Sequence, residues 1–405
     1  MRSMNVLAMV GVVLVFGSQA VGTTYTSVVG NKEWASNLTW GTPLATDYPQ
    51  LAGDIANVYH KITYLRATGM PTGNAYVYPG GEICSAATGG PFALVNVHME
   101  GGGINTFAGS WYAPVGQPLR SMYVEVDSYV TKGTATAGGA VGWSGAGQAV
   151  AMHGTADLTM TGVGTFYADV TSDFSGTYII EPTANNVIFD MWGASGWLTG
   201  NFHIESGGNV HQSTTAAADV YHHTMSGEGA WTTRTSKKLT FGSGSILRPG
   251  DANAPDAAVF SLGLPAYDSP KFDFGAGSTV MIDVTSDTTY DQLVLNMPTT
   301  GTSANILDDA LLQVNLYTPL VETTISNLVI WNSTNLVING MYTLGDISYT
   351  NNTGWDSLSV VKSADSKQLL LSGHYSSVIP EPGTLLLVGT GVLGLLGYIR
   401  RRRMK

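Results

Sequence analysis

The chain has 405 residues, of which 44% are hydrophobic and only 12% are charged, and its formal net charge is −11. Six of its 18 basic residues lie in the two end segments, so the part between them is more acidic still. This balance excludes nucleic acid as a partner, because phosphate contacts need clustered Lys and Arg. The 50 Gly residues and the scarcity of strong helix formers favour a β-rich body, long enough for one large domain or two ordinary ones.

The N-terminal segment has the three parts of a secretory signal peptide. Arg2 supplies the positive charge, Val6–Phe16 forms the apolar stretch, and small residues follow. We expect a cut between Ala20 and Val21, with a cut after Gly22 as a second possibility. The apolar stretch is too short to cross a bilayer about 30 Å thick as a helix. The sequence therefore predicts an N-terminal signal helix and export by the Sec machinery.

Residues 23–377 form a body of short strands. Only Leu51–Ala67 has apolar spacings of three and four, and it is either a short helix or, from the alternation in Lys61–Leu65, a strand. Elsewhere, β-rich runs separated by Gly, Asn, Asp and Ser recur every ~8 to 15 residues, which is typical of an all-β fold. These runs are Phe92–Glu100, Ser121–Val130, Gly176–Glu181, Asn186–Trp192, Ser278–Val284, Asp291–Met297, Leu311–Tyr317 and Asn327–Gly340.

Two all-β architectures fit these runs. A β-sandwich needs tight hairpin turns, and the only Asn-Gly pair is Asn339–Gly340, with no Asp-Gly. A parallel β-helix, or β-solenoid, stacks short strands coil on coil and needs few charges. We favour the β-helix and keep the sandwich as the alternative. Thr131–Met152 reads as a loop or irregular coils, with a possible boundary near residue 150, and Asp309–Tyr375 as the last coils or a capping sheet.

Metal-binding patterns in the body are weak. Asp219, His222 and His223 form the best local cluster, but neighbouring residues of a strand point to opposite faces, so a polar loop is favoured. Asp251–Asp256 matches a calcium loop only in its first and third positions, and we expect a turn. The single cysteine, Cys84, excludes an intramolecular disulfide, and we expect it to be a small buried side chain. The sequence predicts neither a metal nor a cofactor.

Two patterns bear on carbohydrates. Glu125 and Asp127 fall on one face of a predicted strand and could be the paired carboxylates of a polysaccharide-cleaving enzyme, or two solvated acids. Tryptophans in Ser110–Pro114 and Met191–Trp197, including Trp192, could form a sugar-binding platform, although core packing is the more common role. We expect no enzymatic activity, and keep a polysaccharide-active enzyme or a carbohydrate-binding adhesin as alternatives.

The middle of the body resembles a known class of exported proteins. Leu158–Phe189 is similar to a passenger-associated repeat of autotransporter-type proteins, and Leu239–Gly263 with Phe272–Leu295 resembles the closing coils of the same class. Those passengers are β-helices, so the resemblance implies a β-helix for roughly residues 155–300. It implies no catalytic residue, and the segment after Leu295 is too short for the membrane barrel of that class.

The C-terminal segment, residues 378–405, has three parts. Pro380, Glu381 and Pro382 are followed by an uncharged stretch over residues 383–399 and then by the four arginines Arg400, Arg401, Arg402 and Arg403. Prolines hold an extended backbone that an enzyme cleft can grip, and the arginines would keep the end of a transmembrane helix in the cytoplasm. This arrangement resembles the PEP-CTERM sorting signal of exported proteins of Gram-negative bacteria that make exopolysaccharide and biofilm.

That resemblance implies a partner and a destination. An exosortase, a membrane-embedded transpeptidase-like enzyme, would recognise Pro380–Pro382 and cut nearby, so the protein would be membrane-anchored only in transit. The body would then reach the cell surface or extracellular matrix as a structural or interaction protein, associated with exopolysaccharide. The alternative is a simple single-pass anchor that remains in place.

Overall fold

The computed structural model describes an almost entirely β-stranded body. The described residues are 22–30, 32–44, 48–51, 53–64, 72–85, 94–106, 111, 120–131, 140–141, 150–161, 164–169, 172–181, 187–192, 197–212, 219–233, 238–251, 257–263, 271–296, 310–317, 322–333, 347–376 and 400. They form three sheets and one short helix, α1 (Asn37–Trp40). No helix among these residues is long and apolar enough to cross a membrane.

Sheet A has 16 strands. They are β1 (Thr24–Thr26), β3 (Ile55–Val58), β5 (Thr72–Val77), β7 (Leu94–Glu100), β9 (Arg120–Val126), β11 (Ala140–Val141), β12 (Val150–Gly154), β14 (Gly164–Asp169), β16 (Val187–Trp192), β19 (Asn209–Gln212), β22 (Ala230–Thr233), β25 (Val259–Gly263), β28 (Gln292–Asn296), β30 (Thr323–Ser333), β32 (Trp355–Lys362) and β33 (Gln368–Tyr375).

Sheet B has 13 strands and sheet C has four. Sheet B holds β2 (Lys32–Glu33), β4 (Lys61–Tyr64), β6 (Glu82–Ser85), β8 (Gly103–Asn105), β10 (Ser128–Thr131), β13 (Leu158–Thr161), β15 (Thr177–Ile180), β18 (Asn201–Ile204), β21 (Thr224–Gly227), β24 (Ile246–Pro249), β27 (Thr279–Val284), β29 (Leu311–Leu316) and β31 (Ile347–Thr350). Sheet C holds β17 (Trp197–Leu198), β20 (Asp219–Tyr221), β23 (Lys238–Phe241) and β26 (Lys271–Phe274).

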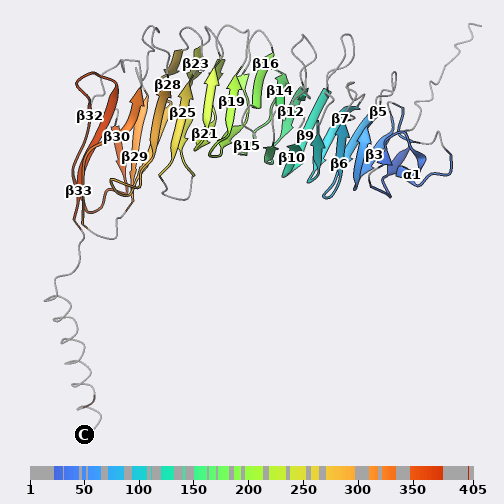
Figure 1. Cartoon of the computed structure of the whole chain (residues 1–405), viewed down its shortest axis with the longest axis horizontal. Coiled ribbons are helices and arrows are strands. Elements are labelled where there is room, and N and C mark those ends of the chain that lie inside the picture. Colours follow the sequence, from blue (N-terminus) through green and yellow to red (C-terminus); the bar gives the residue numbers. More distant parts are fainter. Residues whose placement is uncertain are drawn as a thin grey trace, which may run out of the picture.

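The strands follow one another along the long axis of an elongated body (Figure 1). Successive strands of the chain fall alternately in sheets A and B, except that β11 and β12 share sheet A, as do β32 and β33. From β16 to β27, a strand of sheet C lies between each sheet A strand and the following sheet B strand. We call one passage of the chain through the sheets a circuit. Each strand pairs in parallel with the strand of the same sheet in the next circuit, except at the C-terminal end. Parallel partners need a crossover rather than a tight hairpin. These long parallel sheets are compatible with a β-helix.

The core is one continuous hydrophobic cluster. In-register pairing repeats the same inward position from strand to strand, so that Val77, Met99 and Val124 lie side by side and are fully buried. Further along, Phe202 packs 4.9 Å from Tyr178 and 5.0 Å from Trp231, measured between ring centroids. Inward positions must therefore stay apolar in every circuit, whereas outward positions are free to vary.

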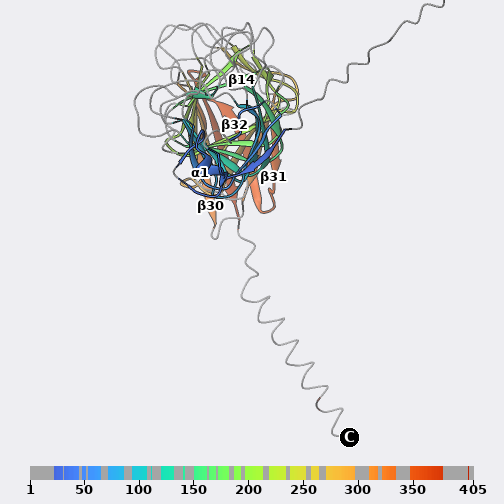
Figure 2. The same cartoon turned by 90° about the vertical axis from the view of Figure 1, so that its right-hand side faces the viewer.

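The two ends of the body are closed differently. At the N-terminal end, seen in front in Figure 2, the rings of Trp34 and Trp40 pack edge to face at 4.9 Å beside α1. At the C-terminal end, β33 pairs antiparallel with both β30 and β32. Trp355 on β32 and Tyr375 on β33 are directly paired, and their ring centroids lie 5.5 Å apart. The segment Asp309–Tyr375, expected as last coils or a capping sheet, continues both main sheets: β29 and β31 extend sheet B, while β30, β33 and β32 end sheet A in antiparallel pairs.

Most sequence-predicted strands are confirmed, with one correction. Within Leu51–Ala67 the strand alternative is right, because β3 and β4 occupy Ile55–Val58 and Lys61–Tyr64. Ser121–Val130 is not a single strand: β9 ends at Val126 and β10 begins at Ser128, so the chain passes from sheet A to sheet B at Asp127. The expected terminal helices fall in residues 1–21 and 383–399, outside the described residues.

Candidate functional site

Four aromatic side chains form a continuous stack on the outer face of sheet A. Tyr76 on β5, His98 on β7, Tyr123 on β9 and His153 on β12 occupy paired positions on neighbouring strands. Successive ring centroids are 4.3, 4.6 and 4.8 Å apart, and the planes lie within 21° of parallel. Their buried neighbours in the chain point into the core, so alternation places these four outside. We call this row the Tyr–His face.

Two further rows flank the Tyr–His face. On one side, the Asn96 side-chain amide donates a hydrogen bond of 2.7 Å to the side-chain oxygen Oδ1 of Asn74. On the other side, the rings of Tyr59 and Tyr78 stack at 4.4 Å and 7°, and Tyr59 is 43% exposed. Hydroxyl, imidazole and amide groups thus gather over the first circuits of the body.

The surroundings of the Tyr–His face are acidic. The His153 Nδ1 lies 2.5 Å from an oxygen of the exposed Asp173. Burial lowers the pKa of His98, and the nearby Glu125 carboxylate opposes that shift only in part. Arg120 is the only Lys or Arg on the sheet A strands from β3 to β12 that the structure describes, and it is buried. The described strands that carry the face therefore expose carboxylates but no Lys or Arg.

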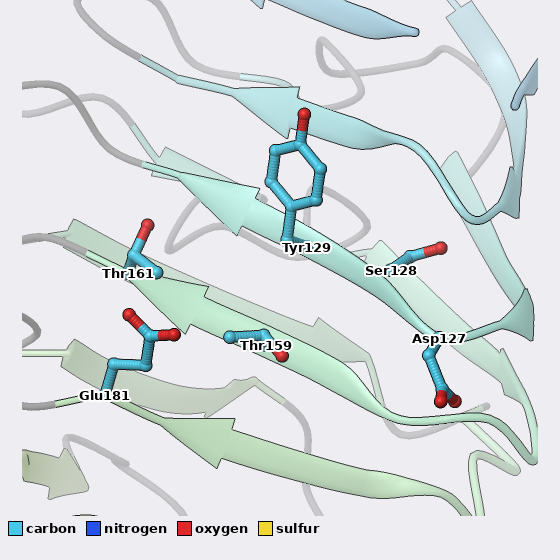
Figure 3. Close-up of a pocket in the computed structure, with 6 residues that line it drawn as sticks. All are labelled: Asp127, Ser128, Tyr129, Thr159, Thr161 and Glu181. Atoms are coloured by element: carbon cyan, nitrogen blue, oxygen red, sulfur yellow. The ribbon is translucent and has the colours of Figure 1, made fainter. Parts of the chain in front are cut away.

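A groove crosses the outer face of sheet B (Figure 3). Its volume is about 420 Å³, and the residues that line it are Asp127, Ser128, Tyr129, Thr159, Thr161 and Glu181. Figure 3 shows Asp127 at one end, and Glu181 beside Thr161 at the other. Asp127 also accepts a hydrogen bond of 3.0 Å from the backbone N–H of Asp157, so it holds the corner between two circuits.

Beside this groove, Glu82 is the centre of a hydrogen-bond network. Its Oε1 lies 2.8 Å from the Lys61 ammonium and accepts hydrogen bonds of 3.0 Å from the Cys84 thiol and the Asn105 amide. The Tyr129 hydroxyl donates to its Oε2 at 3.2 Å. Burial alone would raise the pKa of Glu82, but the hydrogen bonds, first from Cys84 and then from Lys61, lower it below its ordinary value. The network fixes an ionised carboxylate and joins β4, β6, β8 and β10.

Cys84 is inert rather than reactive. Burial, together with the hydrogen bond to Glu82, raises the pKa of its thiol to about 12. The thiolate is the nucleophilic form, and it is scarce in the folded protein at neutral pH. The expectation that Cys84 is a small buried side chain is confirmed, because only 7% of the residue is exposed.

A serine, a histidine and an aspartate meet further along sheet B. Ser226 Oγ lies 3.1 Å from His203 Nδ1, and His203 Nε2 lies 3.2 Å from Asp251 Oδ1. The hydroxyl is also 3.4 Å from the Phe202 carbonyl oxygen. Since His203 and Ser226 are directly paired on β18 and β21, cross-strand packing accounts for the contact. We therefore interpret Ser226 and His203 as a polar cross-strand pair and not as a catalytic serine with its base.

The structure separates the two acids that the sequence places on one strand face. Glu125 lies on β9 in sheet A, while Asp127 lies at the corner and lines the sheet B groove. The expected placement of Glu125 and Asp127 on one face of a single strand is therefore wrong, because the strand ends at Val126 and the chain then changes sheets. The acid that shares the groove with Asp127 is Glu181, from the end of β15.

The two weak metal-binding patterns of the sequence gain no support in the described part of the chain. No group of three His, Cys, Asp or Glu side chains that could hold a metal ion occurs among the described residues. His222 Nδ1 contacts the Ser243 carbonyl oxygen at 3.1 Å, and the His223 ring packs against Tyr221. The side chain of Asp219 and residues 252–256 of the suggested calcium loop lie outside the description.

At Trp111 the favoured interpretation, core packing rather than a sugar-binding platform, is confirmed. Trp111 is fully buried, and its Nε1 donates to the Leu94 carbonyl oxygen at 3.0 Å, so it belongs to the core. The side chains of Trp192 and Trp197 lie outside the description. The residues of the Tyr–His face were not singled out from the sequence. Aligning the segments Tyr76–Gly80, His98–Gly102, Tyr123–Asp127 and His153–Asp157 places these four aromatic residues at the same position.

Comparison with known proteins identifies the C-terminal segment. Residues 378–403 match the PEP-CTERM protein-sorting motif. This match supports an exported, cell-surface-directed protein that an exosortase recognises. It contains Pro380–Pro382 and Arg400–Arg403, of which the structure describes only Arg400. No curated protein and no solved structure matches the chain.

Proposed function

We propose that the protein is an exported structural or interaction protein of the cell envelope or extracellular matrix, associated with exopolysaccharide. The observation that carries this proposal is the sorting motif at residues 378–403, joined to a long parallel-sheet body. The body acts as a β-solenoid, a rigid spacer of repeated circuits with variable outward positions. Its resemblance to autotransporter passengers over residues 155–300 supports the same architecture.

In this proposal, the C-terminal segment is a sorting signal that is recognised and then cleaved off. Residues 383–399 hold the chain in the membrane during transit, and the four arginines keep its end on the cytoplasmic side. An exosortase then cuts at or near Pro380–Pro382 and frees the body for the surface. The logic parallels other anchors in which a hydrophobic C-terminal tail is discarded after recognition.

Mass spectrometry of the mature C-terminus tests this proposal in cells. We expect the surface form to lack Arg400–Lys405, and replacement of Pro380, Glu381 and Pro382 by alanine to leave the tail attached. The matched control replaces Arg400–Arg403 by lysine, which keeps the positive charge and should leave processing unchanged. Recovery of mature surface protein that still carries the tail would refute the sorting role.

The sheet B groove supports a second candidate, a polysaccharide-active enzyme. The specific observation is that two carboxylates, Asp127 and Glu181, line one groove. Asp127→Asn and Glu181→Gln would each abolish glycan cleavage if this were the activity, because glycoside hydrolysis uses a pair of acids. Wild-type protein that cleaves no member of a polysaccharide panel would exclude it. We favour the non-enzymatic function, since Asp127 has a structural role at the corner.

A further inference from the structure

We propose that the Tyr–His face binds a neutral, extended polysaccharide chain that lies along the long axis of the body. The inference rests on the proposed function and deepens it, because it names a ligand class and a binding surface for an interaction protein. The surface consists of the Tyr–His face with its flanking rows on β3, β5, β7, β9 and β12.

The geometry of the stack determines how such a ligand is recognised. The rings cover one another at 4.3 to 4.8 Å, so their outer edges, with the tyrosine hydroxyls and imidazole nitrogens, are the parts left for solvent. Tyrosine hydroxyls donate and accept hydrogen bonds, a neutral imidazole does both, and the neighbouring Asn74 and Asn96 add amide groups. A ligand rich in hydroxyls matches this set better than an apolar one. The exposed ring of Tyr59 adds an aromatic surface at the N-terminal side.

Charge selects among hydroxyl-rich polymers. The acids near the surface are Glu100, Glu125 and Asp173, and the described strands that carry it expose no Lys or Arg. An acidic polysaccharide or a nucleic acid would meet like charge without a compensating cation. A neutral glycan avoids that repulsion, and carboxylates at the rim can accept hydrogen bonds from its hydroxyls. The electrostatics therefore favour a neutral chain.

Periodicity selects an extended chain over a single sugar. Neighbouring strands of a sheet are about 4.8 Å apart, which is close to the length of one pyranose unit in an extended glycan. A chain parallel to the axis would then meet a new strand with almost every sugar. Individually weak contacts add when they are linked in this way. The row is preformed by backbone pairing, so little side-chain conformational freedom is lost on binding.

Affinity electrophoresis of the full-length protein in mild detergent tests the proposal. The probes are gels that contain a soluble, neutral linear β-glucan or the acidic polymer polygalacturonate. We expect the neutral glucan to retard the wild-type protein and polygalacturonate to leave its mobility unchanged. Tyr76→Phe with Tyr123→Phe keeps the stacked rings and removes two hydroxyls. Loss of two hydrogen bonds should weaken retardation at least about fivefold.

The matched control is Tyr349→Phe, which removes a hydroxyl from β31 of the opposite sheet, outside the groove, and should leave retardation unchanged. A complementary variant, Glu125→Lys, introduces a cation and should produce retardation by polygalacturonate. Absence of wild-type retardation by the glucan, preferential retardation by polygalacturonate, or equal retardation of wild type and the Tyr76/Tyr123 variant would each overturn the proposal. Tail processing of the same variants, measured by mass spectrometry, reports separately on the proposed sorting function.

Discussion

The buried ion pair between Arg248 and Asp283 allows a quantitative test of the fold. Asp283 is 1% exposed, and its Oδ2 accepts hydrogen bonds from Arg248 Nη2 at 2.5 Å and Nε at 3.1 Å. Its other oxygen accepts from the Asn315 amide at 2.7 Å. The three residues lie on β24, β27 and β29, so the cluster joins three successive circuits of sheet B.

Replacement of Arg248 by methionine would leave the Asp283 carboxylate buried without its cation. Breaking a buried pair in this way costs about 3 to 5 kcal/mol. We expect the lower end, about 3 kcal/mol, because Asn315 still donates one hydrogen bond. The double variant Arg248→Met with Asp283→Asn removes the unpaired charge. Its free energy of unfolding should lie within about 1 kcal/mol of the wild-type value.

Urea unfolding of the full-length protein, followed by tryptophan fluorescence, measures the difference. With a slope of about 3 kcal/mol/M, the single variant should unfold about 1 M earlier than wild type. Hydrogen exchange should show the loss of protection first in β24, β27 and β29, because each circuit contacts only its neighbours. A double variant that is as unstable as Arg248→Met would refute the assignment of the cost to an unpaired carboxylate.

Three further predictions concern single sites. Cys84 in folded protein should react with iodoacetamide at pH 8 roughly a thousandfold more slowly than in urea, since its pKa is raised to about 12; similar rates by mass spectrometry would contradict this. Gly103→Ala would place a Cβ 2.1 Å from the Tyr129 ring and should cost about 1 to 3 kcal/mol in thermal unfolding. The same change should cost little in a Tyr129→Ala background. Burial lowers the pKa of His98 and of His223 below 6.5 in the folded state, so stability present above pH 6.5 should decline as the pH falls below it. The pH dependence of Tm should be shallower in His98→Asn with His223→Asn; an unchanged slope would oppose that reasoning.

Much of the body was predictable because strand alternation is local. Runs such as Ser278–Val284 and Leu311–Tyr317 coincide closely with β27 and β29, whose first four residues alternate between partly exposed and buried. The break at Asp127 was missed because the alternating pattern continues through the corner without a Gly or Pro. A corner of one residue leaves no compositional signal, and only the pairing of β9 and β10 with different sheets reveals it.

The surface sites were less predictable than the strands. Tyr76, His98, Tyr123 and His153 become neighbours only through the register of four strands, and the connecting segments differ in length. Glu181 likewise joins Asp127 through the stacking of sheet B. The C-terminal motif required no folding to be recognised, since its three parts are contiguous in the sequence. The sorting motif could thus be recognised from contiguous sequence, whereas the surface sites could be recognised only from the strand register.

The position of β33 determines how the body would resist a pull on its C-terminal end. β33 lies between β30 and β32, is antiparallel to both, and ends at Tyr375, a few residues before the sorting motif. Tension applied to the C-terminal end of the body, just after Tyr375, would act along β33 and load its hydrogen bonds on both sides together, in shear. We expect single molecules held by their C-termini to resist forces that readily peel β32, which is paired on one side only. Shear flow across a cell surface is a setting in which such an attachment would have mechanical value.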